Sequence, residues 1–415
     1  MRRICPPTLF ALAAFLATTA TATGATNARL RGTFTMHGRI TVAHSVYGEH
    51  VGQHVVRTWT FYPQCNSGAC SRVVLKRRRS AKHILDTIAL NRKSPGVYSG
   101  RGRFWIPLEC DGQLVRHGGI ANEQITVHIT RAVGSGGTRY ATGITASYYN
   151  PSRYQYTRCP GGIGRDGATY GGTLAVKAIA GSSAAGYFIL TADGAVFNFG
   201  TATSHGGEAG ALKFGQHAVG ITVQPGGGYW VLNSDGSVKA FGAPWQGSLA
   251  GKLHGTRAVG IAASGSAGYL ILTSDGGVHP FGNAAWHGSD RGKLARGVRA
   301  VSLAVNATGG YWVLTSNGAV GGFGVASQGS LRGRLNGHRP VQIVAAPRRG
   351  YLILTGDGGV HPFGKAPFHG SDAGKLPSGV RAVSLAPDLK TGGYWLLKSN
   401  GGVDAFHAPW KGSLS

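Results

Sequence analysis

The sequence predicts an all-β protein, with an N-terminal antiparallel barrel or sandwich domain followed by a six-bladed β-propeller. Only 14% of the residues are charged and 70 are glycine, a composition that suits short strands and tight turns better than amphipathic helices. Apolar and polar residues alternate in several runs of the N-terminal half, as in strands with one buried face. In the C-terminal half a Gly-Tyr motif followed by apolar residues occurs six times, starting at Gly186, Gly228, Gly268, Gly310, Gly350 and Gly393.

Each repeat, about 41 residues long, predicts four short strands. An apolar run such as AVGIAA, from Ala258, precedes the Gly-Tyr strand. An Asp-Gly or Asn-Gly turn follows that strand, and then come a run that ends in Phe and a short segment such as PWQGSL. These dipeptides favour the positive φ angles of tight hairpins, and four antiparallel strands in a repeat of this length match one propeller blade.

Three repeats of this length could instead close a β-trefoil. The odd-numbered repeats read GY(F/L)IL, whereas the even-numbered repeats read GYW(V/L)L, so the repeating unit is a pair. Two trefoils would place a boundary in the middle of a pair, whereas three pairs close a single ring. We therefore expect a propeller.

The repeat sequences GYWVLNSDGSVKAFG and GYLILTSDGGVHPFG resemble the tandem repeats of secreted and cell-surface proteins of high-GC bacteria. The resemblance covers Leu174–Ser415 and implies an extracellular or wall-associated interaction domain, without specifying an activity. The Asp-box of sialidase propellers places a residue between Asp and Gly, whereas Asp235 and Gly236 are adjacent in this chain. The sialidase analogy therefore fails.

The first 25 residues predict a signal peptide. Arg2 and Arg3 precede an apolar run, and a small-residue pattern predicts cleavage near Ala22 or Ala25. No later stretch approaches the 18 or so consecutive apolar residues that a spanning helix needs. We expect an extracellular or cell-wall-associated protein with no transmembrane segment, and a monomer.

Residues 26–158 are expected to form the barrel or sandwich, residues 159–173 a glycine-rich linker, and residues 174–415 the propeller. Removal of the signal peptide leaves four cysteines, an even number that predicts two disulfides in an oxidising compartment. The favoured pairing joins Cys65 with Cys70 and Cys110 with Cys159.

No catalytic residue, cofactor site or metal site is predicted. The Gly-x-Gly-x-x-Gly pattern from Gly162 lacks the strand-then-helix context of a dinucleotide site, and the acids are too few for a clear glycosidase pair. Two histidine pairs could face each other across hairpins but lack a third metal ligand: His279 with His287, and His361 with His369. The aromatic residues of the Gly-Tyr strands could stack on sugars, but they are predicted to be core.

The formal net charge of +27 predicts anionic partners. If the strand before each Gly-Tyr motif is innermost, the links between repeats open on the same face as the turns between the second and third strands. These links carry Lys252, Arg257, Lys293, Arg299, Arg334, Arg339, Lys375 and Arg381. The turn aspartates share this face, namely Asp193, Asp235, Asp275 and Asp357, so simple exposed ion pairs are the alternative interpretation.

These features together favour a non-enzymatic binding protein that engages an anionic polymer, a cell-wall glycan or another cell-surface component through a basic propeller face. A protein partner is also compatible with the sequence. The alternative is a secreted polysaccharide-active hydrolase or lyase. A cleft in which Glu109 or Asp111 faces another carboxylate would favour that alternative.

Overall fold

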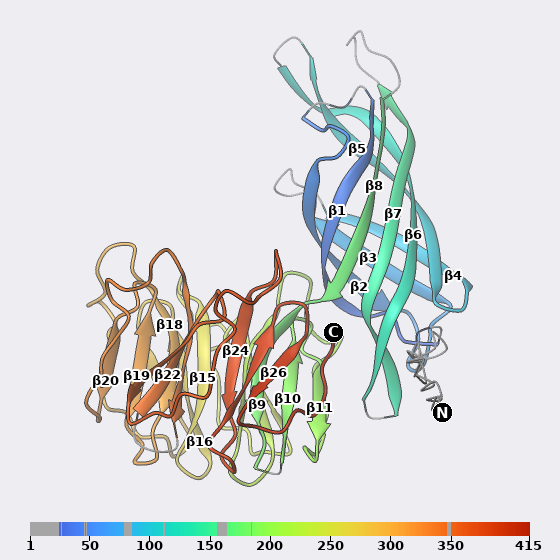
Figure 1. Ribbon diagram of the computed structural model, residues 1–415. Coiled ribbons are helices and arrows are strands. Elements are labelled where there is room, and N and C mark those ends of the chain that lie inside the picture. Colours follow the sequence, from blue (N-terminus) through green and yellow to red (C-terminus); the bar gives the residue numbers. More distant parts are fainter. Residues whose placement is uncertain are drawn as a thin grey trace, which may run out of the picture.

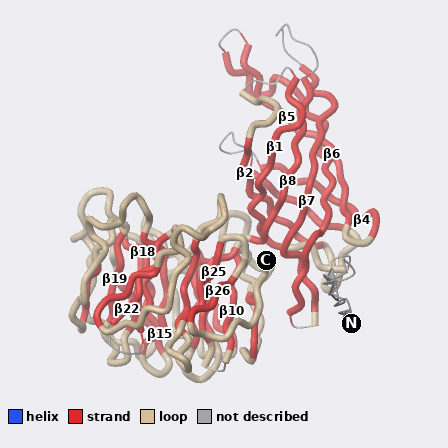
Figure 2. The backbone as a smooth tube through the Cα atoms, viewed as in Figure 1, coloured by secondary structure: helices blue, strands red, loops and turns tan. Residues whose placement is uncertain are grey.

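The computed structural model describes residues 25, 27–44, 46, 48–78, 85–110, 113–135, 137–155, 164–183, 185–346 and 350–415, except for the side chains of 106–110, 113–118 and 153–155. All 26 elements in these ranges are strands, which confirms the all-β class. Figure 1 shows a tall barrel standing at one side of a ring of small sheets, and Figure 2 shows the loops that join them.

The barrel consists of eight antiparallel strands, each paired with its neighbours in the chain, and β8 pairs with β1 to close it. The strands are β1 (Gly32–His44), β2 (His54–Pro63), β3 (Arg72–Arg78), β4 (Leu85–Ser94), β5 (Val97–Cys110), β6 (Gln113–Ser135), β7 (Thr138–Gln155) and β8 (Gly164–Leu174). Buried Phe34 and Met36 alternate with more exposed threonines on β1, so one face of the strand packs inside. The Phe34 ring meets the Phe61 ring edge-on at 5.6 Å.

The prediction of a linker at residues 159–173 is wrong over Gly164–Leu174, because this segment is β8 and pairs with both β1 and β7. One of its glycines, Gly172, is required by close packing. A Cβ atom on Gly172 would lie 2.4 Å from the Met36 sulfur and 2.7 Å from an Ile144 methylene, so a side chain does not fit there. Residues 159–163 lie outside the described residues. The barrel therefore continues to Leu174, beyond the expected boundary at residue 158.

The ring consists of six three-stranded antiparallel sheets. The strands, three to a sheet, are β9 (Val176–Gly181), β10 (Gly186–Thr191), β11 (Val196–Gly200); β12 (Ala218–Val223), β13 (Tyr229–Asn233), β14 (Val238–Phe241); β15 (Ala258–Ser264), β16 (Gly268–Thr273), β17 (Val278–Phe281); β18 (Ala300–Val305), β19 (Tyr311–Thr315), β20 (Val320–Phe323); β21 (Pro340–Ala346), β22 (Gly350–Thr355), β23 (Val360–Gly364); β24 (Ala382–Pro387), β25 (Tyr394–Lys398) and β26 (Val403–Phe406). The first strand of each sheet contacts the first strand of the next, and β24 contacts β9, so the sheets close a circle (Figure 1).

The prediction of a fourth strand in each repeat is wrong. In the second sheet the segment after β14 is irregular, because Pro244 has no N–H to donate and Gly247 has a φ of 123°. This segment is nevertheless held against the sheet. The Trp245 indole N–H donates to the Val238 carbonyl at 3.1 Å, and the Leu249 N–H donates to the Gly236 carbonyl at 2.9 Å.

Tyrosine hydroxyls join successive sheets. The Tyr311 hydroxyl accepts the His287 N–H at 3.0 Å and donates to the Gly288 carbonyl at 2.6 Å, both in the segment that follows the preceding sheet. The equivalent contact of Tyr187 with the Gly412 carbonyl closes the ring, since it joins the first sheet to the last segment of the chain. The prediction that the aromatic residues of the Gly-Tyr strands are core is confirmed, because none of them is more than 2% exposed: Tyr187, Tyr229, Tyr269, Tyr311, Tyr351, Tyr394, Trp230, Trp312 and Trp395.

The barrel joins the ring without a flexible connection, since Ala175 alone separates β8 from β9. The Ala175 N–H donates to the Thr33 carbonyl at 2.8 Å. Nearby, Arg31 lies 3.6 Å from the Asp193 carboxylate. On the other side of the junction, the Arg78 guanidinium of the barrel lies 5.2 Å from the centre of the Phe214 ring.

The Cys65–Cys70 disulfide is confirmed. Cys159 and the side chain of Cys110 lie outside the described residues, so their pairing stays a prediction. Residues 1–24 also lie outside them, and the signal peptide stays a prediction as well. Within the described ranges, no helix has the length and apolar character needed to cross a membrane.

Replacing Tyr311 with Phe should lower the free energy of unfolding by about 1–2 kcal/mol, because the Gly288 carbonyl loses its donor and the His287 N–H loses its acceptor. Urea denaturation measures the change. Tyr149→Phe is the control, since that side chain is 42% exposed. An equal loss in both variants would contradict a specific role for the hydroxyl between the sheets.

Candidate functional site: a basic face of the ring

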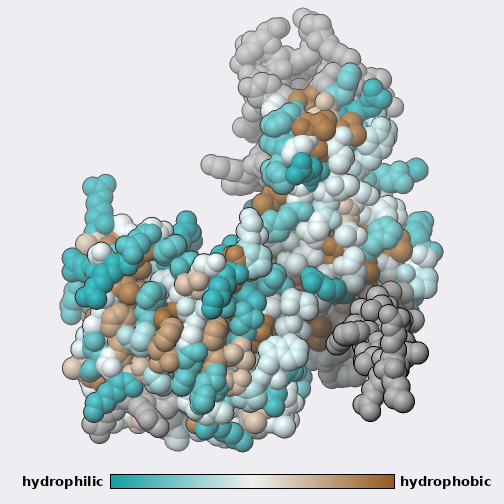
Figure 3. Space-filling model, viewed as in Figure 1, coloured by the Kyte–Doolittle hydropathy of each residue, from teal (hydrophilic) through white to brown (hydrophobic). Residues whose placement is uncertain are grey.

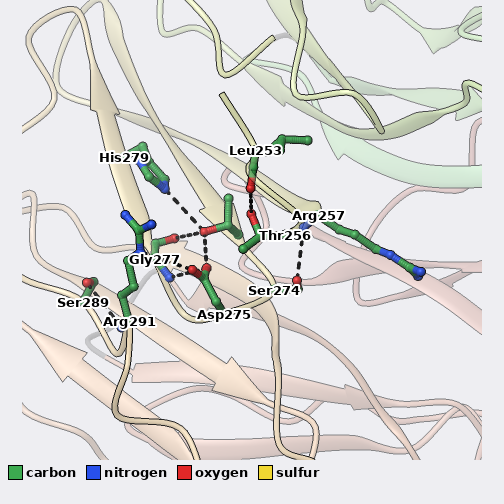
Figure 4. Close-up of polar contacts among 10 residues, drawn as sticks. Leu253, Thr256, Arg257, Ser274, Asp275, Gly277, His279, Ser289 and Arg291 are labelled. Atoms are coloured by element: carbon green, nitrogen blue, oxygen red, sulfur yellow. Dashed lines mark hydrogen bonds and ion pairs between the residues drawn. The ribbon is translucent and has the colours of Figure 1, made fainter. Parts of the chain in front are cut away.

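One face of the ring carries both the turns between second and third strands and the links between sheets. In the third sheet, Arg257 directly precedes β15, its carbonyl accepts the Ser274 N–H at 2.8 Å, and its own N–H donates to the Ser274 hydroxyl at 3.2 Å (Figure 4). Ser274 belongs to the turn after β16, so link and turn lie side by side. Figure 3 shows hydrophilic residues along the edge of the ring from which these loops rise.

The same backbone contact recurs around the ring and places one residue of each sheet at an equivalent position on this face. The position is occupied by Ala175, His217, Arg257, Arg299, Arg339 and Arg381. A second set of cations lies in the links themselves: Lys252, Lys293, Arg334 and Lys375. All eight cations predicted from the sequence are exposed. We call this surface, defined by the eight cations, the basic face.

The turn aspartates of the basic face have other partners. Arg291 lies 3.3 Å from the Asp275 carboxylate, and His338 lies 3.6 Å from that of Asp357. Asp193 pairs with Arg31, and Asp235 accepts a hydrogen bond from the Gln216 amide at 2.8 Å. Among the residues that the structure describes, none of the eight predicted cations lies within ion-pair distance of a carboxylate.

The exposed-pair interpretation therefore does not account for the eight cations. Figure 4 shows Arg257 extending away from Asp275 while Arg291 approaches it. Lys293 and Lys375 interact electrostatically with Asp290 and Asp372 without forming an ion pair, and the eight cations together leave the basic face with an excess of positive charge. Arg291, which lies in the same link as Lys293, was not singled out from the sequence as the partner of Asp275.

A lysine lies where the other sheets carry valine. The first strand of every sheet has a one-residue bulge near the basic face, and the bulged residue is Val219, Val259, Val301, Val341 or Val383 in five of them. In β9 it is Lys177. Burial lowers the pKa of Lys177, and the nearby charge of Arg381 lowers it further. Burial also lowers the pKa of His217, with added effects of Lys177 and Arg257.

A cleft of about 1260 Å³ lies between the basic face and the wall of the barrel. From the ring, Lys177, His217 and Arg381 line it, and from the barrel Arg57 and Arg78. Threonine side chains also line the barrel wall: Thr33, Thr35, Thr58 and Thr60. Asp193 is the one carboxylate among the lining residues, and it is paired with Arg31. Of the eight predicted cations, Arg381 is the one that lines this cleft.

In the ring Asp372 and Asp404 interact, and burial together with Asp404 raises the pKa of Asp372 to about 6. Three further acids are buried inside the barrel. Buried Asp86 lies 3.3 Å from Arg77, which also pairs with Glu123. Asp166 accepts hydrogen bonds from the Tyr148 hydroxyl at 2.8 Å and from the Asn150 amide at 3.0 Å. These three acids of the barrel are buried at 3–4% exposure and do not line the cleft. The side chain of Glu109 and all of Asp111 lie outside the described residues, so the carboxylate pair that would favour a hydrolase stays untested.

The two histidines of each predicted pair contact other residues and not each other. His279 lies 3.4 Å from the Thr273 hydroxyl, whereas the His287 ring packs against the Tyr311 ring at 5.9 Å. In the fifth repeat the His369 ring stacks on the His407 ring at 4.5 Å. In the described part of the chain, no group of three or more His, Cys, Asp or Glu side chains could hold a metal ion.

Four aromatic side chains on the outer segments of the ring are exposed, a feature that the sequence analysis missed. Trp245, Trp286, Phe368 and Trp410 are 55–62% exposed. They occupy equivalent positions, where the first and fourth repeats carry Ser204 and Ser327. The signal was available in the sequence as an aromatic residue just before a polar residue and Gly in four of the six outer segments.

The chain matches no protein-family model and no curated protein. Among solved structures it is similar to virginiamycin B lyase from Staphylococcus aureus, with 12% identity and a TM-score of 0.33 over 57% of this chain and 86% of that one. It is also similar to YCF48 from Cyanidioschyzon merolae, with 13% identity and a TM-score of 0.33 over 58% and 84%. Likeness at this level does not assign a function.

Replacing Arg291 with Ala should raise the pKa of Asp275. Partial burial alone raises that pKa, but hydrogen bonds from the Thr273 hydroxyl and the Gly277 N–H, together with Arg291, outweigh burial and hold it below the usual value. Because the pKa is lower in the folded state, Asp275 stabilises the fold above its unfolded pKa, and this is lost as the pH falls through the folded pKa.

NMR titration of the Asp275 carboxyl checks this, with Asp357 of the same protein as the reference because its partner is His338. The variant should show a higher pKa for Asp275, an unchanged pKa for Asp357 and a weaker loss of stability in acid. An unchanged pKa for Asp275 would show that the ion pair is absent in solution.

Proposed function

We propose that this chain is a non-enzymatic, extracellular or cell-wall-associated binding protein whose six sheets form a six-bladed β-propeller. Its basic face engages an anionic polymer or an anionic cell-surface component. The observation that supports the proposal most directly is the set of eight exposed cations on one face, none of which is ion-paired to a described carboxylate.

The arrangement of these cations suits a polymer. Each of four junctions between sheets carries two of the eight, so positive charge is distributed along the face, and Arg381 alone of the eight lines the cleft beside the barrel. Such a surface attracts a flexible polyanion over a Debye length of about 8 Å at physiological salt, with little sequence selectivity. Binding that releases counterions weakens steeply as salt rises.

Changing Lys252, Lys293, Arg334 and Lys375 to Glu should abolish low-salt binding to anionic polymers, because the four substitutions lower the charge that the eight cations give to each of their four junctions from +2 to 0. All four side chains are exposed, so the fold should remain intact. Fluorescence anisotropy with a labelled linear glycerol phosphate polymer, at salt concentrations from low to physiological, measures the effect.

A matched control reverses four exposed cations of the barrel, Lys93, Arg101, Arg103 and Arg131, and produces the same net charge. It should retain most of the binding. Equal losses in both variants would show that binding depends on net charge alone. Full binding by the first variant would exclude the basic face as the site.

The exposed aromatic residues favour a second candidate function, which is binding of a neutral glycan on the outer rim of the ring. Two of the four rings are held in place by indole hydrogen bonds, those of Trp245 and Trp410. The Trp410 indole N–H donates to the Val403 carbonyl at 3.0 Å, and the adjacent Lys411 N–H donates to the Tyr187 hydroxyl at 3.3 Å. The Phe368 side chain has no N–H group and is 55% exposed, so a hydrogen bond that covers a strand edge does not explain why all four positions carry an aromatic residue. A fixed, exposed aromatic face is a platform on which a sugar ring stacks.

Changing all four aromatic residues to Ser, as the first and fourth repeats have at Ser204 and Ser327, should reduce neutral glycan binding by roughly tenfold or more. Binding to the glycerol phosphate polymer should stay unchanged, because no charge is altered. A glycan array read with both proteins checks this. Identical glycan profiles would show that the rings only cover the edges of the sheets.

A further inference from the structure

The cleft between the barrel and the ring has cations on both of its walls. Lys177, His217 and Arg381 lie on the wall formed by the ring, and Arg57 and Arg78 on the wall formed by the barrel. Like charges gathered in one space repel each other unless a counter-ion lies between them. The single carboxylate of the lining is already paired with Arg31, so no described residue that lines the cleft supplies this counter-ion.

Among the cations that line the cleft, Lys177 points most directly to a bound anion. Partial burial of an ammonium group costs free energy unless a partner offsets it, and no described carboxylate lies within ion-pair distance of this one. The fold does not require a lysine here, because valine occupies the same bulged position in the other five sheets. Bulges are also over-represented next to functional sites, where they direct a side chain.

We propose that this cleft binds a phosphate group of a linear phosphodiester polymer, with Lys177 and Arg381 contacting it from the ring and Arg57 and Arg78 from the barrel. The inference rests on the proposed function and deepens it, because it names the ligand class and adds the barrel as a second binding wall. The remaining length of the polymer lies along the basic face, to which Arg381 belongs.

The geometry favours a phosphate over a carboxylate. Donors approach from two facing walls, and a tetrahedral oxyanion accepts hydrogen bonds from several directions, whereas a carboxylate presents its oxygens in one plane. Hydroxyl groups line the barrel wall beside the arginines: Thr33, Thr35, Thr58 and Thr60. Two of them lie close together, since the Thr33 and Thr60 hydroxyl oxygens are 3.1 Å apart. Arginine forks and threonine hydroxyls are common phosphate donors.

The test replaces Lys177 with Val, the residue of the other five sheets. Without ligand, this variant should melt roughly 2–4 °C higher, because it removes a half-buried charge that lies near Arg381 and His217. With the glycerol phosphate polymer at physiological salt, its affinity should fall about tenfold or more. Lys177→Arg keeps the charge and should retain most of the affinity.

The outcomes separate this inference from the proposed function. If Lys177→Val binds normally while the four-residue variant of the basic face does not, the cleft inference is wrong and the proposed function stands. If both variants bind normally, both proposals are wrong.

A lower melting temperature for Lys177→Val would show that the lysine is structural and would overturn the inference. A polygalacturonate chain of equal charge provides the last comparison. If Lys177→Val weakens its binding as much as it weakens binding of the phosphate polymer, the assignment to phosphate is wrong.

Discussion

The ring depends on one repeated contact, the tyrosine hydroxyl that joins each sheet to the segment following the sheet before it. A three-stranded sheet of four- to seven-residue strands has little core of its own, so it must bury both faces against neighbours. The hydroxyl fixes the distance between those neighbours while the tyrosine ring fills the space between them, as Tyr311 does with Gly288. The contact between Tyr187 and Gly412 then turns an open array into a closed ring, because it joins residues from its two ends.

The barrel and the ring are joined at Ala175, and the cleft lies beside this junction. The chain leaves β8 and enters β9 with one residue between them, so the wall of the barrel lies close to the basic face. Arg31 with Asp193 and Arg78 with Phe214 hold the two domains together beside the opening. A flexible linker would allow the two walls to separate, whereas this connection keeps the cations of both domains facing a single space.

The periodic features of the fold could be predicted from sequence alone, and the features that depend on contacts between distant segments could not. The repeats predicted the six sheets, the turns and the face that carries Arg257 and Arg381, because each depends on local pattern. The prediction of a fourth strand was wrong because the sequence of a short apolar segment does not show how the segment is held. It can pair with a strand through its backbone, or it can be held by a side chain, as the Trp245 indole does here. The prediction of a linker was wrong because a glycine-rich sequence can indicate either flexibility or close packing. Gly172 packs against Met36, which lies on a strand more than a hundred residues earlier in the chain.

Departures from the repeat are therefore as informative as the repeat itself. At the position where four sheets carry arginine and one carries histidine, the first sheet has Ala175, because its backbone turns there into the barrel. Two residues later the same sheet has a lysine where the others have valine. The first sheet thus loses a cation on the surface that the barrel occupies and gains one at the adjacent bulge, which lines the cleft. A ring built only for its own stability has no need for this exchange, whereas a site shared between ring and barrel does.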